Sequence, residues 1–526
     1  MKKGILFCFL CSILGMSGML QAQKDSTHFV TTWKTTNIGV VGDSSIYINV
    51  DPNYTYNYDV DWNNDGIFDT LGVTTSIVHQ YPDTGTYTVR IKGIFPGVSM
   101  RGLNGSLYVF KLIALEQWGT TVWTRLDSAF YGAINMQYNA QDVPNITAVS
   151  DLRYLFFQNF LFNGNLSNWN VSNITNMESM FYACFVFNND ISGWDVSNVT
   201  DMSSMFIGVD MSFSLDVWNV SAVTKMDQMF QESAYNQPLN SWDVSSVTTM
   251  HLMFLSSNFN QALNNWDVSS VTDMGSMFGR ADFNQPIDNW DVSNAMNMRG
   301  MFSYSTAFNQ AINSWDVSSV ANMEYMFYET RNFDQPLDNW NVSNVTNMNG
   351  MFIGAYNFNQ SLSSWDVSNV TTFANAFDST ALSLKNYDDL LTSWSAQNVK
   401  NGVPFGAAGL DYCLGNAARI HLQNNFSWTF TGDTLDCLTV GVEEALAESN
   451  KEVFKVYPNP SEGRITLELE KLNQNSELLY IYNTKGQLMQ TERITALKQE
   501  LDLSSLKRGL YVLKFASISK RVVLTE

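Results

Sequence analysis

A short stretch near the N-terminus carries oxygen-bearing side chains at alternate positions, a spacing that suits a calcium ion. The candidate ligands are Asp61, Asn63, Asp65 and Asp69. With Gly66, which lets the chain turn so that the oxygens converge, they match the first part of a calcium loop of the form D-x-[DN]-x-[DN]-G. Gly72 stands where such a loop has its closing acid. The sequence therefore leaves two interpretations open, a calcium site or a β-turn rich in Asp and Asn.

A second set of carboxylates follows repeated tryptophans farther along the chain. These are Asp195, Asp243, Asp267, Asp291, Asp316 and Asp366. Stacked carboxylates repel one another, and Asn170, Asn219 and Asn341 stand in their place in other repeats. We therefore expect a local role, in which each side chain accepts a hydrogen bond from the backbone near the following Ser, as in an Asx-turn. A ladder of bound cations is the alternative interpretation.

The remaining residues offer no catalytic constellation. The four histidines are scattered over the chain, and no Cys/His cluster has the spacing of a metal site. There is no nucleophile elbow, P-loop or dinucleotide-binding fingerprint. The sequence predicts that the protein is not an enzyme and that it has no cofactor other than the calcium considered above.

Residues 1–22 have the features of a signal peptide. Lys2 and Lys3 precede an apolar run from Ile5 to Leu14, and Ala22 is a small residue before the expected cut. The run is short for a membrane-spanning helix, and no later stretch is apolar enough to span a bilayer. We expect the mature chain to begin near Gln23 and to be exported to an oxidising compartment.

Three cysteines remain in the mature chain. Cys413 and Cys437 lie close together beyond the last regular repeat, and we predict a disulfide between them. A closed loop of about 25 residues would stabilise the fold by about 3 kcal/mol. Cys184 takes the place that Ala355 has in another repeat, so we interpret it as a small buried core residue.

One repeated unit, W-(D/N)-V-S-x-V-x-x-M-x-x-M-F followed by F-N-Q-x-L, must position most of these residues. Its tryptophans are Trp169, Trp194, Trp218, Trp242, Trp266, Trp290, Trp315, Trp340 and Trp365, at intervals of 24 or 25 residues. A period of this length is typical of stacked repeats. Met177, Met180, Phe181 and Cys184 have the i, i+3, i+4, i+7 spacing of a helical stripe. The stretch from Leu239 to Val244 predicts a short strand. If the coils stack in register, like residues lie above one another, so columns of Trp, Met and Phe side chains should fill the core. Asn-Gln pairs should form hydrogen bonds between successive coils.

This motif resembles the BspA-like leucine-rich-repeat surface proteins, specifically the bacterial surface repeat of about 25 residues known as DUF285. The resemblance covers about 60% of the chain. It implies a leucine-rich-repeat-like solenoid, adhesion or interaction in some relatives, and no catalytic residues. The fold class expected from motif and resemblance is therefore a repeat solenoid, with one short strand and one short helical turn per coil, flanked by two small β-sandwich modules.

The N-terminal flank, about 23–110, alternates at strand period in Ser45–Val50 and Thr86–Ile91. The stretch HQYPDTGTYTVRIKG, His79 to Gly93, resembles the polycystic-kidney-disease (PKD) type of immunoglobulin-like module. That family's usual W-D-F-G-D-G is absent, and Val60 to Gly66 reads V-D-W-N-N-D-G instead.

The C-terminal flank, about 455–526, resembles the C-terminal sorting domain of the type IX secretion system of Bacteroidota. The motifs that carry this resemblance are Val456–Pro460, Leu479–Asn483, Lys485–Gln487, Leu501–Ser504 and Gly509–Leu513. The resemblance implies handling by the type IX machinery, transport across the outer membrane of a Gram-negative cell, and removal of the domain.

The composition restricts the partners. Asp and Glu number 50 against 29 Lys and Arg, and the formal net charge is −21. Such a balance disfavours nucleic acid, which needs a basic patch, and favours a soluble monomer.

We therefore predict five segments: a signal peptide at 1–22, a β-sandwich at 23–110, a capped solenoid at 111–438, a linker at 439–454 and a sorting domain at 455–526. The predicted function is non-catalytic binding or adhesion at the cell surface, to an unknown protein or glycan. The alternatives are a passive spacer that projects the N-terminal module, and a glycan-directed accessory or enzyme. In a binding protein, the repeats should differ from one another at exposed positions on one face. Such differences occur at His251, Leu252, Arg299 and Tyr325.

Overall fold

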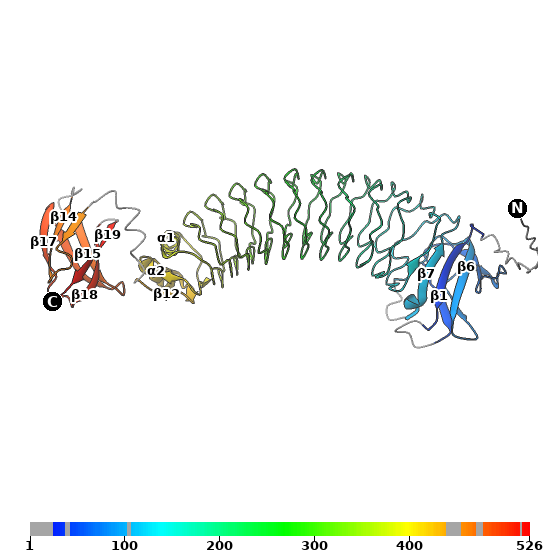
Figure 1. Ribbon diagram of the computed structural model, residues 1–526, viewed down its shortest axis with the longest axis horizontal. Helices are drawn as coiled ribbons and strands as arrows, with labels where there is room; N and C mark the ends of the chain where they lie inside the picture. Colours follow the sequence, from blue (N-terminus) through cyan, green and yellow to red (C-terminus); the bar gives the residue numbers. More distant parts are fainter. Residues whose placement is uncertain are drawn as a thin grey trace, which may run out of the picture.

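The computed structural model describes residues 25–36, 43–101, 107–437, 454–469, 477–515 and 518–525. The predicted signal peptide and nearly all of the predicted linker lie outside these ranges. Figure 1 shows a β-rich N-terminal part, a long curved stack of similar coils, and a β-rich C-terminal part. We call each 24- or 25-residue repeat of the stack a coil.

The N-terminal part is built on one six-stranded sheet with the order β4-β3-β6-β1-β7-β8. At its centre, β1 (Phe29–Lys34) pairs antiparallel with both β6 (Thr86–Ile94) and β7 (Leu112–Gln117). The other sheet strands are β3 (Asn57–Asp61), β4 (Thr70–Val73) and β8 (Gln137–Tyr138). A separate pair is formed by β2 (Ser45–Ile48) and β5 (Ile77–Gln80), and the 3-10 helix η1 spans Leu107–Lys111. Because β8 pairs parallel with β7 and belongs to the first coils, the sheet runs directly into the stack.

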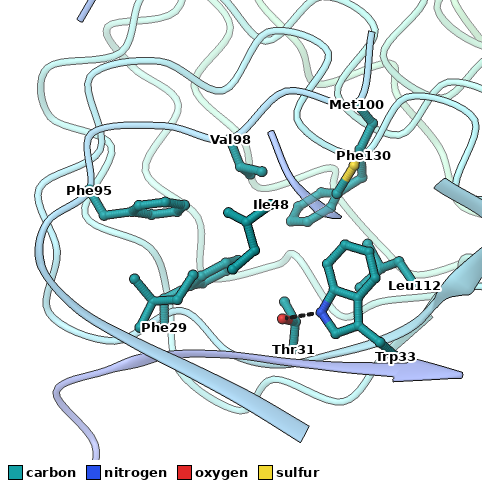
Figure 2. A pocket seen from close by; sticks show the side chains of 10 residues that line it. Phe29, Thr31, Trp33, Ile48, Phe95, Val98, Met100, Leu112 and Phe130 are labelled. Carbon is teal, nitrogen blue, oxygen red and sulfur yellow. Dashed lines mark hydrogen bonds between the residues drawn. The ribbon is translucent and has the colours of Figure 1, made fainter. Parts of the chain in front are cut away.

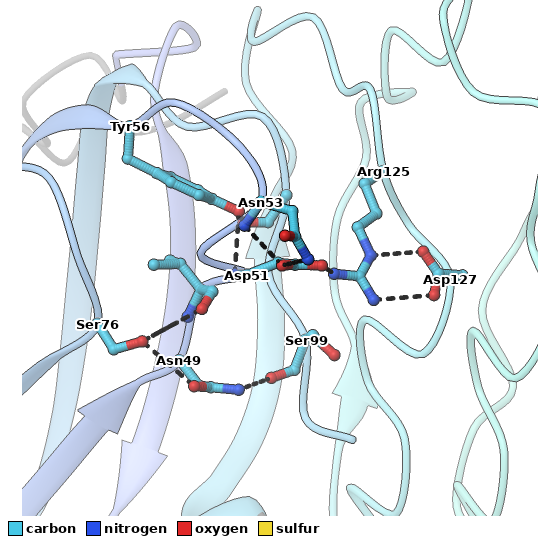
Figure 3. A network of polar contacts seen from close by, with 10 residues as sticks. Asn49, Asp51, Asn53, Tyr56, Ser76, Ser99, Arg125 and Asp127 are labelled. Atoms are coloured by element: carbon cyan, nitrogen blue, oxygen red, sulfur yellow. Dashed lines mark hydrogen bonds and ion pairs between the residues drawn. The ribbon is translucent and has the colours of Figure 1, made fainter. Parts of the chain in front are cut away.

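A shared core and a polar network join the N-terminal part to the first coils. A small cavity of about 10 Å³ is lined by residues of β1, β2, β6 and β7, by Phe95, Val98 and Met100 of the segment after β6, and by Phe130 of the first coil. Figure 2 shows most of these side chains around it. Beside it, Arg125 forms an ion pair with Asp51 of the N-terminal part and donates to Asp127 at 2.6 and 3.0 Å (Figure 3). The hydrophobic core is continuous from Phe29 to Trp428. The N-terminal part therefore covers the end of the stack, where the apolar interior would otherwise face water.

Successive coils are linked by single parallel bridges rather than by strands. The bridged residues are Asp151, Asn176, Asp201, Lys225, Thr249, Asp273, Asn297, Asn322, Asn347 and Thr372. Each occupies the position just before the first Met, or its equivalent, of its repeat. The coils thus stack in register, and like residues lie above one another.

The fold-class prediction of a leucine-rich-repeat-like solenoid, with a strand and a helical turn in each coil, is wrong. Among the described residues there are two α-helices, α1 (Leu384–Ser395) and α2 (Asn416–Phe426), and both follow the last coil. Most of the regular secondary structure is β-strand, in several small sheets at the two ends. The coils themselves consist of turns and isolated bridges.

Two positions in each coil explain why the predicted helix does not form. Ser179 and Ala183 have φ of 55° and 57°, in the left-handed region that a right-handed helix cannot contain. The first position recurs as Tyr154, Ser179, Ser204, Gln228, Leu252, Ser276, Gly300, Tyr325, Gly350 and Asn375. The second recurs as Gln158, Ala183, Gly208, Glu232, Ser256, Arg280, Tyr304, Glu329, Gly354 and Ser379. We call these sets the first and second left-handed ladders.

The left-handed residues redirect backbone hydrogen bonds from within a coil to the next coil. Ser179 N–H donates to Ser203 C=O, and Ala183 N–H donates to Ile207 C=O, both at 2.8 Å. The intervening Tyr182 N–H donates back to Ser179 C=O at 3.2 Å. A left-handed residue costs about 1–2 kcal/mol, and a net backbone hydrogen bond returns about 1 kcal/mol. The stack therefore replaces helical bonds with bonds along its own axis.

Aromatic ladders fill the interior, as the repeat predicted. From Trp194 to Trp394, each indole N–H donates to a Leu or Ile carbonyl of the preceding coil at 2.8–3.2 Å. From Phe156 to Phe377, consecutive rings of a phenylalanine ladder lie 5.4–6.0 Å apart. The indole bonds satisfy the one polar atom of each buried Trp, so the ladder carries no unpaired donor over this range.

Asparagine side chains bond along the stack as well. The Oδ1 of Asn236 accepts from Asn260 N–H at 2.9 Å and from Gln261 Nε2 at 3.1 Å. The same pattern continues through Asn284 and Asn309 to Asn359, with Asp334 in the place of one Asn. Each Asn thus fixes the register of the next coil.

The last coil is closed by α1, α2 and four short strands. These strands are β9 (Pro404–Gly406), β10 (Asp411–Tyr412), β11 (Thr429–Thr431) and β12 (Thr434–Leu435). Asp388 of α1 accepts hydrogen bonds from the backbone amides of Cys413, Leu414 and Gly415, which precede α2. Burial raises the pKa of Asp388 even though these amides oppose the rise. The two helices are therefore tied together through a buried carboxyl group.

The C-terminal part, from residue 454 onward, has its own core. It contains a three-stranded sheet, β13-β14-β17, and a four-stranded sheet, β16-β15-β18-β19. The strands are β13 (Phe454–Tyr457), β14 (Arg464–Leu469), β15 (Glu477–Asn483), β16 (Leu488–Ile494), β17 (Lys498–Asp502), β18 (Gly509–Phe515) and β19 (Ile518–Leu524). Both sheets contribute to one cluster that includes Leu467 and Leu513 and shares no residue with the core of the stack.

Candidate functional site

The predicted calcium loop is held by hydrogen bonds within itself. Asp61 is fully buried, and its carboxylate accepts from the backbone amides of Asn63, Asp65 and Gly66 at 3.0–3.3 Å. Asn63 donates through Nδ2 to Asp65, and Asp69 accepts from Trp62 N–H. Within the described ranges, no group of three or more His, Cys, Asp or Glu side chains is placed to hold a metal ion. The carboxylate of Asp61 is thus already engaged by backbone amides, and calcium binding at this loop stays a prediction.

The aspartates that follow the tryptophans act locally. Asp195 Oδ1 accepts from Ser197 Oγ at 2.6 Å and from Ser197 N–H at 3.1 Å. The Ser hydroxyl and then the Ser amide lower the pKa of Asp195, and the same causes act on Asp243 and Asp291. Each side chain therefore closes an Asx-turn in its own coil.

The three cysteines of the predicted mature chain have different environments. Cys413 and Cys437 are joined by a disulfide, with their Cα atoms 5.0 Å apart. Cys184 is buried and free, and its thiol donates to Phe156 C=O at 3.1 Å. Burial raises the pKa of the Cys184 thiol far above its usual range, so the reactive thiolate does not form near neutral pH.

The outer side of the coils from 276 to 353 is hollowed into an open groove of about 410 Å³. The residues that line it are Ser276, Arg299, Gly300, Ser303, Tyr304, Tyr325, Tyr328 and Ile353. Ser276, Gly300 and Tyr325 belong to the first left-handed ladder, and Tyr304 belongs to the second. Among the residues of these two ladders, some, including Ser179 and Ala183, are buried, but none belongs to the continuous core cluster. The left-handed residues that line the groove therefore lie outside the core cluster of the stack.

Three tyrosines hold one another in place along this groove. The Tyr304 and Tyr328 rings meet edge-on at 4.8 Å, and Tyr304 OH donates to Tyr328 OH at 3.2 Å. The Tyr325 and Tyr328 rings meet edge-on at 5.6 Å. The rings form a preorganised aromatic surface with hydroxyl groups at its edge.

Charged groups border the tyrosines. Arg299 donates through Nε to Glu324 at 2.9 Å, and its guanidinium lies 6.0 Å from the centre of the Tyr325 ring. Asn349 Nδ2 donates to the other oxygen of Glu324 at 3.0 Å. Arg280 lies over the Tyr304 ring at 4.3 Å. The groove therefore offers hydrogen-bond donors and acceptors next to aromatic faces.

Differences between the repeats of this chain predicted two of the lining residues, Arg299 and Tyr325. The structure places both in the groove, whereas His251 and Leu252 lie outside the lining set. Tyr304 and Tyr328 were missed. For Tyr304 a signal was available, because the other coils carry small or polar residues at its position. Tyr328 gave no such signal, because other coils also carry large apolar residues at its position, among them Tyr182 and Ile207.

Two families match parts of the chain. Residues 99–216, 209–313 and 279–394 match the family described as "Mycoplasma protein of unknown function, DUF285". These matches cover more than half of the 526 residues. The chain belongs to the DUF285 family. The predicted resemblance to this repeat is thereby confirmed, while the PKD-like resemblance has no family match.

Residues 455–525 match the family described as "Secretion system C-terminal sorting domain". The second predicted resemblance is thus also confirmed, and it indicates secretion to the cell surface or beyond. Neither family description names a catalytic activity. No curated protein and no solved structure matches this DUF285 protein. Within the described residues, no helix is long and apolar enough to cross a membrane.

Proposed function

We propose that this DUF285 protein is a non-catalytic binding protein displayed on the outer surface of a Gram-negative cell. The observation that carries the proposal is the groove of three interlocked tyrosines, which is lined by side chains outside the core cluster of the stack. Tyr and Arg are the residues that most often dominate binding interfaces. A rigid stack that holds them in fixed register presents a preorganised surface for a ligand.

Binding to surface components tests this proposal. The full chain without residues 1–22 is applied to one array of glycans and one array of extracellular proteins. We expect saturable binding to at least one class of ligand. Absence of binding to both arrays contradicts the proposal and favours a passive spacer.

The groove supports binding rather than catalysis. Glycoside hydrolysis, the enzymatic alternative suggested for a glycan-directed protein, uses a pair of carboxyl groups that flank the bond. The residues that line the groove include no carboxylate, and the nearby Glu324 is ion-paired with Arg299. The spacer alternative treats the N-terminal part as a projected module, and the core that this part shares with the first coils supports an end cover instead.

The route to the surface follows from the two ends of the chain. We propose that residues 1–22 direct the chain to the periplasm, that the type IX machinery then recognises 455–526, and that the segment 439–454 is cut. The match over 455–525 and the separate core of this part support the proposal. Such a sorting signal is read by a receptor and is not itself an anchor.

Deletion of 455–526 tests the route. We expect the truncated protein to accumulate in the periplasm, and the native surface form to end before about residue 455. Surface display of the truncated protein, or a native surface form that retains Glu526, contradicts the proposed role of this domain.

A further inference from the structure

The groove exists because glycines occupy left-handed positions where neighbouring coils carry side chains. Gly300 has φ 62°, and a Cβ atom there would lie 2.8 Å from Ser276 Oγ. Gly350 has φ 59°, and a Cβ atom there would lie 2.4 Å from Cε1 of the Tyr325 ring. The first glycine therefore leaves open the space beside Ser276, and the second leaves room for the Tyr325 ring against the next coil.

The groove has little net charge, although the whole chain is strongly acidic. Arg299 is neutralised by Glu324, and Arg331 on the adjacent coil is neutralised by Glu329 at 2.9 Å. Arg280 has no ion-pair partner within the described residues, but its guanidinium is engaged with the Tyr304 face. A strongly anionic ligand would face Glu324 and Glu329, and a cationic ligand would face the arginines. The charges favour a neutral ligand that both donates and accepts hydrogen bonds.

The backbone around the groove excludes an added peptide strand. The N–H groups of Gly300, Tyr304 and Tyr325 already donate to carbonyls of the next coil at 2.6–2.9 Å. Recognition by strand addition needs free backbone groups at a sheet edge. Globular partners usually cover about 800 Å² on each side, whereas a concavity of about 410 Å³ lies in the range of small-ligand sites.

We propose that this groove binds a neutral oligosaccharide. The apolar face of a sugar ring packs on the Tyr325 and Tyr328 rings, and its hydroxyl groups bond to the Arg299–Glu324 pair and to the tyrosine and serine hydroxyls. The repetition of Arg–Tyr contacts along successive coils, with Arg280 over Tyr304 and Arg299 near Tyr325, aligns a linear glycan with the stack axis. This inference rests on the proposed binding function and specifies its ligand.

Matched variants of the full chain test the inference. Tyr325→Ala/Tyr328→Ala removes two groove rings. Tyr154→Ala/Tyr182→Ala removes tyrosines from the equivalent positions of other coils, outside the groove. The probes are short neutral oligosaccharides of hexoses and N-acetylhexosamines, with uronic-acid oligosaccharides as the acidic comparison. We expect the groove variant to weaken neutral-glycan binding by about tenfold or more, because aromatic contacts and their buried area are lost, and the control variant to bind unchanged.

A third variant tests whether binding depends on the shape of the groove as well as on the side chains that line it. Gly350→Ala keeps every tyrosine but forces the Tyr325 ring to move, and we expect it to weaken binding while the thermal unfolding curve stays cooperative. Neutral-glycan binding that is equal in all variants overturns the groove assignment. Binding restricted to acidic glycans or to proteins overturns the ligand assignment but leaves the surface-binding function intact. Absence of every ligand overturns both.

Discussion

Within each coil, the interior positions and the left-handed positions differ in what they tolerate. Trp, Met and Phe recur at nearly the same interior places, and most of these side chains are fully buried. The first left-handed ladder instead carries residues as different as Ser204, Leu252, Gly300 and Tyr325. The interior must fill a fixed volume against similar neighbours, whereas the left-handed residues lie outside the core cluster and contribute to the stack mainly through backbone hydrogen bonds. Stability and recognition are therefore assigned to different positions of the same short repeat.

Among substitutions that compare interior with left-handed positions, the largest loss of stability is expected at Trp266. Its side chain is 3% exposed, it stacks between Trp242 and Trp290 at 6.4 Å, and its indole donates to Leu239 C=O. We expect Trp266→Ala to lower the free energy of unfolding by about 3–5 kcal/mol, measured by urea denaturation. Tyr325→Ala on the left-handed ladder is the control, with an expected change within about 0.5 kcal/mol. A loss below about 1 kcal/mol for Trp266→Ala would remove the distinction between the two sets.

At the C-terminal end of the stack, where the aromatic ladders stop, we expect the Cys413–Cys437 disulfide to stabilise the fold. We expect Cys413→Ser/Cys437→Ser to lower the free energy of unfolding by about 3 kcal/mol. Mass spectrometry of the non-reduced native protein should find Cys413 bonded to Cys437 and Cys184 unmodified by a thiol reagent, because burial raises the pKa of that thiol. Two free thiols at 413 and 437 contradict the prediction.

Ser256 tests whether the coils contain turns or helices. It has φ 56°, and its side chain does not belong to the core cluster. In a left-handed turn, Ser256→Gly should be more stable than Ser256→Ala by about 1 kcal/mol, because Gly has no Cβ penalty there. In a helix the order is reversed by a similar amount. Thermal or urea unfolding of the two variants decides between them, and a more stable Ala variant would restore the helical interpretation.

The smallest change in stability is expected outside the coils, when calcium is added to the loop from Asp61 to Asp69. Its carboxylates already accept backbone amides, so millimolar calcium should leave the thermal unfolding of the N-terminal part nearly unchanged. Differential scanning calorimetry with and without calcium measures this. A large shift in the melting temperature that disappears in Asp65→Ala would show that the loop is a metal site.

The repeat period of the sequence predicted which side chains fill the interior, but it did not predict the backbone conformation of the coils. The spacing of Trp and Phe implied stacked ladders, and the Asn-Gln pairs implied bonds between coils, and both are present. The helix prediction failed because the spacing of Met177, Met180, Phe181 and Cys184 places side chains on one face in a series of turns as well as in a helix. Side-chain periodicity does not report the sign of φ at Ser179 and Ala183.

The candidate groove was only partly predictable for a related reason. Arg299 and Tyr325 stood out because they depart from the repeat. The contact between Tyr304 and Tyr328, which lie 24 residues apart, depends on the register between coils. Sequence order alone does not place two such residues side by side.

The amino-acid sequence by itself determined the repeat, its period, the membership of the family, the sorting domain and the set of side chains that fill the core. These follow from composition and spacing, which are properties of the linear chain. The tertiary structure decided that the coils are built from left-handed turns and that the N-terminal sheet covers the end of the stack. It also decided that Gly300, Tyr304, Tyr325 and Tyr328 form one groove. These features depend on hydrogen bonds and contacts between residues about one coil apart, which exist only after the coils have stacked.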